Sequence, residues 1–100
     1  MVIRLDPEEV ETKRLHAIVG DFTGKRVLEI GSGNGRMTWR YASQAKFVVG
    51  IDPNQEQIDK AQKDCPEHLR EKVTFHAQDF LNYHSPKETT FDITILSWSL

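Results

Sequence analysis

The sequence has a single cysteine, Cys65, among its 100 residues. One cysteine excludes an intrachain disulfide, and nothing else in the sequence indicates an oxidising compartment. The 4 histidines also lack the spacing of a metal-ligand set, so we expect no metal site.

Two further features are scarce: an excess of positive charge and long apolar runs. The formal net charge of −2 argues against general binding to nucleic acid or to an anionic membrane. The first residues, "MVIRLDPEEV", turn acidic before any apolar stretch is long enough for a signal peptide or a membrane span. We therefore expect a cytoplasmic protein with no membrane partner.

What the sequence does contain is typical of one small globular domain. Its hydrophobic content of 38% and charged content of 28% are ordinary for a soluble chain. We find no internal repeat and no low-complexity run, and we expect a single domain over residues 1–100.

The order of the apolar segments predicts an α/β fold. Apolar, β-branched runs predict strands over 26–31, 46–52, 72–78 and 91–98. Helices are expected from Asp6-Pro7, over about 35–45, and from Pro53 to Pro66, with a short turn at 80–83. Strands that alternate with helices in this way indicate a Rossmann-like, doubly wound sheet of parallel strands with flanking helices.

Acidic residues fall at one predicted edge of this sheet. Glu29 interrupts the apolar run "RVLEIG", where a carboxylate is costly unless something satisfies it. Asp52 and Asp79 stand near the ends of the next two strands. In open α/β sheets the ligand binds outside the carboxyl ends of the strands, so the three acids predict a ligand site there.

The glycines after the first strand restrict the class of ligand. A dinucleotide fingerprint has glycines at its first, third and sixth positions. Counted from Gly31 as the first position, this loop has Gly33 at the third and Gly35 at the fifth. The sixth position is Arg36. A NAD-binding Rossmann fragment therefore stays only as a lesser alternative.

The observed pattern is acid-x-Gly-x-Gly-x-Gly, from Glu29 to Gly35. It resembles the first motif of the class I S-adenosylmethionine-dependent methyltransferases. The segments "VVGIDPN", "HAQDF" and "FDITILSWSL" are similar, in the same order, to the family's motifs on the second, third and fourth strands. The resemblance covers residues 26 to 100 and implies methyl transfer from S-adenosylmethionine, with S-adenosylhomocysteine as the product.

The resemblance also implies how the nucleoside is held. Asp52 would accept hydrogen bonds from both ribose hydroxyls, and Asp79 would accept one from the adenine amino group. The backbone N–H of Phe80 would meet a ring nitrogen. Ile51 and Pro53 would pack against the adenine or against the chain around it.

The remaining predicted contacts involve the methionine end of the ligand and the acceptor. Glu29 would help to order the glycine loop and the methionine end, directly or through water. Ser97 and Trp98 stand where the family often contacts its substrate. The full set of predicted cofactor-binding residues is Glu29, Gly31, Ser32, Gly33, Gly35, Asp52, Pro53, Asp79, Phe80 and Ser97. We assign no catalytic residue, because no convincing general base stands in residues 1–100.

Each prediction has a structural alternative. Asp52 and Asp79 could simply be helix caps. Arg36, for which a contact with the cofactor carboxylate is the alternative, is interpreted as a solvated side chain. Tyr41, like Trp39 and Trp98, is most economically a packing residue.

Comparison with the family's size suggests that the domain is partial. The family's sheet usually has seven strands, and this sequence stops before the fifth to seventh. We expect the outer edge of the strand at 91–98 to be bare and to allow self-association. The alternative to an enzyme is a non-catalytic cofactor-binding half-domain that acts with a partner chain. The Asn/Asp-Pro-Pro-aromatic signature of many amino-nitrogen methyltransferases is absent, which favours a small-molecule acceptor over nucleic acid.

Overall fold

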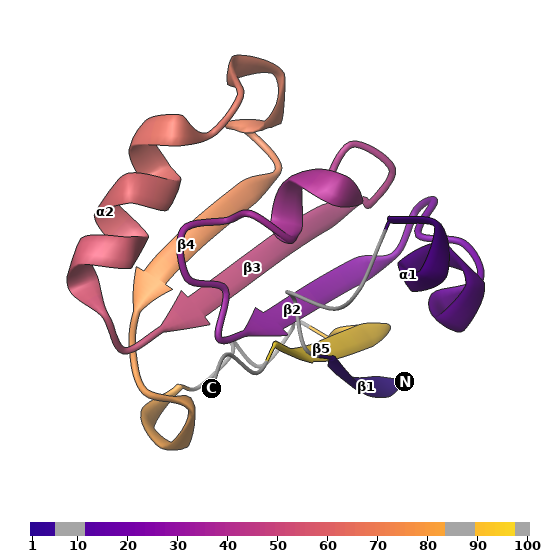
Figure 1. The fold of residues 1–100 in the computed structure, drawn as a ribbon, viewed down its shortest axis with the longest axis horizontal. Coiled ribbons are helices and arrows are strands. Elements are labelled where there is room, and N and C mark those ends of the chain that lie inside the picture. The colour runs from indigo at the N-terminus through magenta and orange to yellow at the C-terminus, as the bar shows by residue number, and fades with distance from the viewer. Residues whose placement is uncertain (6–11, 84–89, 98–100) are drawn as a thin grey trace.

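The computed structural model describes residues 1–5, 12–83 and 90–97, which form a five-stranded, fully parallel sheet with helices packed on it (Figure 1). The strands are β1 (Val2–Leu5), β2 (Arg26–Ile30), β3 (Phe47–Asp52), β4 (Val73–Ala77) and β5 (Ile93–Ser97). The helices are α1 (Thr12–Val19) and α2 (Gln55–Asp64), with short 3-10 turns η1 (Thr38–Arg40), η2 (Glu67–Leu69) and η3 (Phe80–Asn82). The α/β prediction is confirmed.

The strand order places a switch point in the middle of the sheet. The order is β1-β5-β2-β3-β4, so β2, β3 and β4 are laid down in succession and the chain then returns to place β5 on the other side of β2. A parallel sheet whose strand order reverses in this way has the topology of a doubly wound sheet. The carboxyl ends of β2 and β5 meet at the switch point, where ligands bind in such sheets.

The strand β5 is interior, which contradicts the expected bare edge at 91–98. Strand β1 pairs with β5 in parallel, from Val2 opposite Thr94 to Leu5 opposite Ser97. β1 was missed because its four residues precede an acidic segment and carry no periodic pattern. The basis for self-association through this strand is therefore removed, and the edges of the described sheet are β1 and β4.

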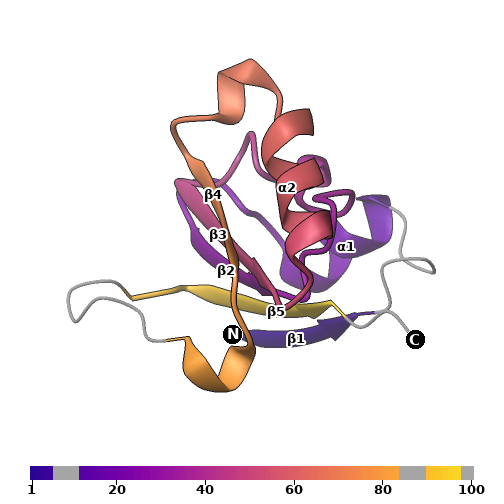
Figure 2. The same ribbon diagram turned by 90° about the vertical axis from the view of Figure 1, so that its left-hand side faces the viewer.

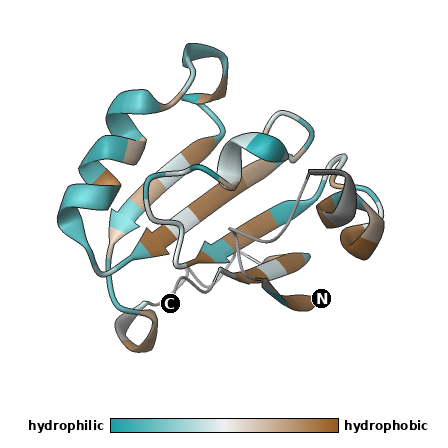
Figure 3. Ribbon diagram, viewed as in Figure 1, coloured by the Kyte–Doolittle hydropathy of each residue, from teal (hydrophilic) through white to brown (hydrophobic). Residues whose placement is uncertain are grey.

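The main core lies between one face of the sheet and the two α-helices. Leu15 and Val19 of α1 and Ile58 and Ala61 of α2 belong to one buried cluster with strand residues such as Val48. Figure 2 shows α1 and α2 on the same side of the sheet, and Figure 3 shows the apolar residues concentrated on the strands.

Within the described part of the chain, no helix has both the length and the apolar character to cross a membrane.

The helix expected over 35–45 is wrong. This segment forms only η1 and a series of turns. Gly35 has a φ of +85°, which breaks helical geometry at the start, and Thr38, Trp39 and Tyr41 are modest helix formers. The Thr38 and Tyr41 side chains instead point into the core, where both donate hydrogen bonds to Glu29.

The start of α2 also differs from the prediction. Asn54, not Asp52, is its N-cap, and the Asn54 side chain accepts a hydrogen bond from the backbone N–H of Gln57 at 3.2 Å. The helix begins at Gln55, two residues after Pro53. The predicted helix start at Asp6-Pro7 lies outside the described residues.

Candidate functional site

The glycine loop after β2 is held tightly against the ends of β3 and β5. The backbone N–H groups of Gly31 and Ser32 both donate to the Ile51 carbonyl, at 2.8 and 3.1 Å. Gly31 has a φ of +83°, and a Cβ there would lie 2.3 Å from the Ser97 carbonyl oxygen. Only glycine permits this close approach of the loop to β5.

The other two glycines have different surroundings. A Cβ on Gly35 would lie 2.5 Å from the Trp39 ring, so Gly35 serves packing and the turn. A Cβ on Gly33 would meet only the end of Gln57, at 3.9 Å, because Gly33 faces an open hollow.

Asp52 is bonded to this loop rather than to a helix end. Its Oδ2 accepts from the Gly33 N–H at 3.0 Å, and its Oδ1 accepts from the Asn54 N–H at 2.9 Å. Each carboxylate oxygen can accept about two hydrogen bonds, so both oxygens keep acceptor capacity. The half-buried Asp52 is thus fixed in place and still able to receive two further donors.

Three hollows formed by the described residues adjoin at the carboxyl edge, and Gly31 and Ser97 line all of them. We call them the loop cavity, the central hollow and the apolar hollow. The loop cavity is lined by Glu29, Gly31, Ser32, Gly33, Asn34, Arg36, Met37, Gln57 and Ser97. The central hollow is lined by Gly31, Gly33, Asp52, Pro53, Asn54, Gln57 and Ser97. The apolar hollow is lined by Ile30, Gly31, Ile51, Pro53, Gln78, Asp79, Phe80, Leu96 and Ser97.

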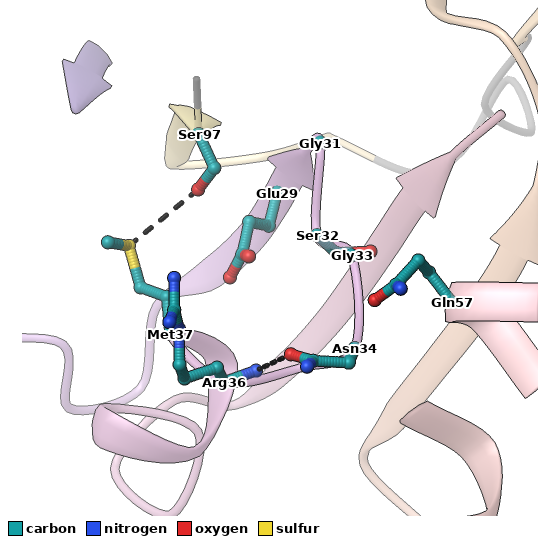
Figure 4. A pocket seen from close by; sticks show the side chains of 9 residues that line it. All are labelled: Glu29, Gly31, Ser32, Gly33, Asn34, Arg36, Met37, Gln57 and Ser97. Atoms are coloured by element: carbon teal, nitrogen blue, oxygen red, sulfur yellow. Dashed lines mark hydrogen bonds between the residues drawn. The ribbon is translucent and has the colours of Figure 1, made fainter. Parts of the chain in front are cut away.

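Glu29 is fully buried, and it projects from β2 toward the loop cavity (Figure 4). Its Oε1 accepts hydrogen bonds from the Tyr41 hydroxyl at 2.6 Å and from the Thr38 hydroxyl at 3.0 Å. Burial raises the pKa of the Glu29 carboxyl to about 7, although these two hydrogen bonds act in the opposite direction. The same burial, with the nearby carboxylate, raises the pKa of Tyr41 well above its usual value.

Asp79 lines the apolar hollow. The Asp79 Oδ1 accepts a hydrogen bond from the Leu81 N–H at 2.8 Å, so Asp79 is the N-cap of η3. The capping role considered as an alternative for Asp79 is therefore present. The neighbouring Phe80 side chain is 56% exposed although it lines a hollow with Ile51 and Pro53. An exposed aromatic beside an apolar hollow is suited to a flat, partly apolar ligand.

The structure brings nearly all the predicted site residues together. Of the ten, nine line at least one hollow, and Gly35 is the exception. The capping role considered for Asp52 is wrong, whereas that for Asp79 is realised. Trp98, the other candidate beside Ser97, lies outside the described residues.

Sequence reasoning missed five residues that surround Glu29 or line its cavity: Asn34, Met37, Thr38, Tyr41 and Gln57. The signal available for Tyr41 was indirect. A buried tyrosine hydroxyl needs a partner, and a buried glutamate needs donors. The packing role predicted for Tyr41 is also present, since its ring stacks on Phe22 at 4.5 Å.

The chemistry of this set is that of an acceptor-rich surface with one apolar compartment. Carboxylates stand in each hollow, so the edge suits a ligand that carries cations and hydroxyl or amino donors. Within residues 1–5, 12–83 and 90–97, no group of three or more His, Cys, Asp or Glu side chains could hold a metal ion.

Comparison with known proteins gives matches over most of the chain. A family model described as a methyltransferase domain matches residues 27–100. The magnesium-protoporphyrin O-methyltransferase of Rhodobacter capsulatus is 32% identical over 98 residues, which is 98% of this chain and 42% of that protein. The tRNA U34 carboxymethyltransferase of Colwellia psychrerythraea is 54% identical over 43 residues, which is 42% of this chain and 13% of that protein.

A solved structure is similar over nearly the whole chain. It is the S-adenosylmethionine-dependent methyltransferase from Geobacter sulfurreducens in complex with S-adenosylhomocysteine, with a TM-score of 0.71 and 28% identity. The match covers 92% of this chain and 36% of that one. The chain thus spans less than half the length of each of these three proteins.

Proposed function

The chain belongs to the class I S-adenosylmethionine-dependent methyltransferase family, and we propose that its carboxyl-edge site binds S-adenosylmethionine for methyl transfer. The single observation that carries the proposal is the arrangement of Glu29, Asp52 and Asp79 in three hollows that share Gly31 and Ser97. When bound, S-adenosylmethionine supplies a methyl group on a positively charged sulfonium.

The apolar hollow suits the adenine. Ile51, Pro53 and Phe80 provide apolar surface on which a purine can pack, and Asp79 stands at the rim as an acceptor for its amino group. The Asp79 Oδ1 already caps η3, which fixes the carboxylate relative to the Phe80 backbone.

The central hollow suits the ribose. Asp52 is held by two backbone N–H groups, one from Gly33 and one from Asn54, so its carboxylate is oriented before any ligand arrives. Such preorganisation reduces the entropy lost on binding. A vicinal diol offers two donors, which matches the acceptor capacity that remains on the two oxygens.

The loop cavity suits the amino-acid end of the ligand. Glu29 offers an acceptor to an ammonium group, and Arg36 lines the same cavity as a cation suited to a carboxylate. The Geobacter sulfurreducens neighbour, whose structure contains S-adenosylhomocysteine, supports this choice of ligand.

We infer a small molecule as the methyl acceptor. The relative matched over nearly the whole chain is named for a porphyrin, and the net charge of −2 does not favour general binding to nucleic acid. A second candidate is an RNA acceptor, which the shorter match to the tRNA U34 carboxymethyltransferase favours.

Calorimetry tests the cofactor assignment. Titrations of the chain with S-adenosylhomocysteine, S-adenosylmethionine and NAD should give binding for the first two and none for NAD. Binding of NAD without a response to S-adenosylhomocysteine would overturn the proposal. Competition between S-adenosylmethionine and 5′-methylthioadenosine would show that the nucleoside part occupies the same site.

A further inference from the structure

Two buried polar atoms in the loop cavity have no hydrogen-bond partner. Among the described residues, these are the Oε2 of Glu29 and the hydroxyl of Ser32. The other carboxylate oxygen of Glu29 is held by two hydroxyl donors, from Tyr41 and Thr38. Glu29 is therefore fixed by one oxygen and unsatisfied at the other, which is costly for a buried ionised carboxylate.

The Glu29 side chain projects toward the loop cavity. Glu29 and Ser32 both line the loop cavity, which has a volume of about 170 Å³ (Figure 4). A cavity of this size admits a small polar group. The group that completes Glu29 can thus be either a proton on Oε2 or a cation supplied by a ligand.

Few charged groups oppose or assist this choice. The residues that flank Glu29 in the sheet are neutral: Gly50 on β3 and Ile95 on β5. Strand β5 also contributes Ser97, whose hydroxyl favours the ionised form of Glu29 and so lowers its pKa. The titratable neighbour is Tyr41, and the charged residue that lines the cavity is Arg36. With a pKa of about 7, the Glu29 carboxyl is protonated in about half of the molecules at neutral pH.

We propose that Glu29 couples cofactor uptake to the release of a proton, with Tyr41 as the positioning residue that holds Oε1 and leaves Oε2 unpartnered. The inference rests on the proposed function, because the ammonium group at the amino-acid end of the ligand is the cation that replaces the proton. The O–H bond at Oε2 breaks, the proton passes to the buffer, and the ammonium group keeps its own protons.

The coupling has a measurable size and sign. If the bound ammonium keeps Glu29 ionised, uptake releases about 0.9 of a proton at pH 6 and about 0.1 at pH 8. The affinity should then be about tenfold higher at pH 8 than at pH 6, with most of the change between pH 6 and pH 7.

The test is calorimetry of the chain at pH 6 and pH 8, each in two buffers of different ionisation enthalpy, with S-adenosylhomocysteine as the probe. The matched control ligand is 5′-methylthioadenosine, which has the same nucleoside and thioether but no amino-acid end. We expect proton release with the first ligand and none with the second.

Two variants test the roles of the side chains. Glu29→Gln should bind without proton release and with an affinity that does not change between pH 6 and pH 8. Tyr41→Phe removes a donor that favours the ionised carboxylate, so proton release at pH 8 should increase, whereas Tyr83→Phe should leave it unchanged. A merely structural Tyr41 would change affinity equally at both pH values and would not change the proton count.

The outcomes separate the two proposals. S-adenosylhomocysteine that binds without releasing protons at pH 6, or equal release with both ligands, overturns the coupling and leaves the cofactor assignment intact. Absence of binding by both ligands overturns the coupling and the cofactor assignment together.

Discussion

Replacement of Glu29 by glutamine should change how the stability of the folded chain depends on pH. The substitution keeps the shape of the side chain and removes its charge. The carbonyl of the substituted side chain can still accept from the Tyr41 and Thr38 hydroxyls.

The size of the effect follows from the raised pKa of Glu29. The pKa is about 7 in the folded chain and 4.5 in the unfolded reference. The folded state therefore holds the proton more tightly, so this group's contribution is fully present below pH 4.5 and is lost as the pH rises through 7. The difference of about 2.5 pKa units corresponds to roughly 3 kcal/mol of unfolding free energy, as an upper estimate for one group.

The assay is urea unfolding of both proteins, followed by circular dichroism at intervals from pH 4.5 to pH 8. The stability of Glu29→Gln relative to the natural chain should rise with pH by up to about 3 kcal/mol, because only the natural chain loses the contribution of Glu29. Other groups act in both proteins alike, including Asp92, whose pKa is held below its usual range by hydrogen bonds from Arg26.

An exposed glutamate provides the control. Glu71→Gln should give a curve parallel to that of the natural chain, since Glu71 is solvent-exposed. If Glu29→Gln also ran parallel to the natural chain, Glu29 would titrate like an exposed carboxylate, and the argument from its burial would be refuted.

Three further substitutions test the site. Asp52→Ala should weaken S-adenosylhomocysteine binding by about 1–3 kcal/mol, measured by calorimetry, and an unchanged affinity would assign Asp52 a purely structural role. Gly31→Ala should lower the free energy of unfolding in urea by roughly 3 kcal/mol or more, because it adds a clash with β5 to an unfavourable φ. Gly24→Ala should lower it by about 1 kcal/mol, from the unfavourable φ alone. Equal losses of stability in the two variants would contradict the close approach of Gly31 to β5. Phe80→Ala should weaken nucleoside binding, measured by calorimetry, by about 1 kcal/mol. Leu81→Ala should not weaken it, because Leu81 is more exposed than Phe80 and lines no described hollow. Equal effects of the two substitutions would argue against adenine in the apolar hollow.

Much of the fold could be predicted because its signals are local. Strands β2 to β5 are short, largely apolar runs bounded by turns or polar residues, a pattern that predicts each strand from its own residues. β1 carries no such signal, because it is a strand only through its pairing with β5, some 90 residues later in the chain. A contact of that kind depends on the completed sheet.

In the candidate site, as in the fold, local signals could be predicted and contacts between distant segments could not. The acids and glycines could be predicted because they stand at strand ends, where the topology of the sheet brings them together. The partners of Glu29 could not, because Thr38 and Tyr41 come from a segment that was expected to be helical and is irregular. The irregular path of this segment turns both hydroxyls toward the Glu29 carboxylate. The hydrogen bonds to Glu29 therefore depend on the absence of a regular helix.

The most direct test of the central claim is a crystal structure of the chain with S-adenosylhomocysteine bound. Density for the ligand should place the ribose hydroxyls on Asp52, the adenine between Pro53 and Phe80 with its amino group toward Asp79, and the ammonium group beside Glu29. Ligand density away from the carboxyl edge of β2, β3 and β5, or a ligand reversed so that the adenine occupies the loop cavity, would contradict the account.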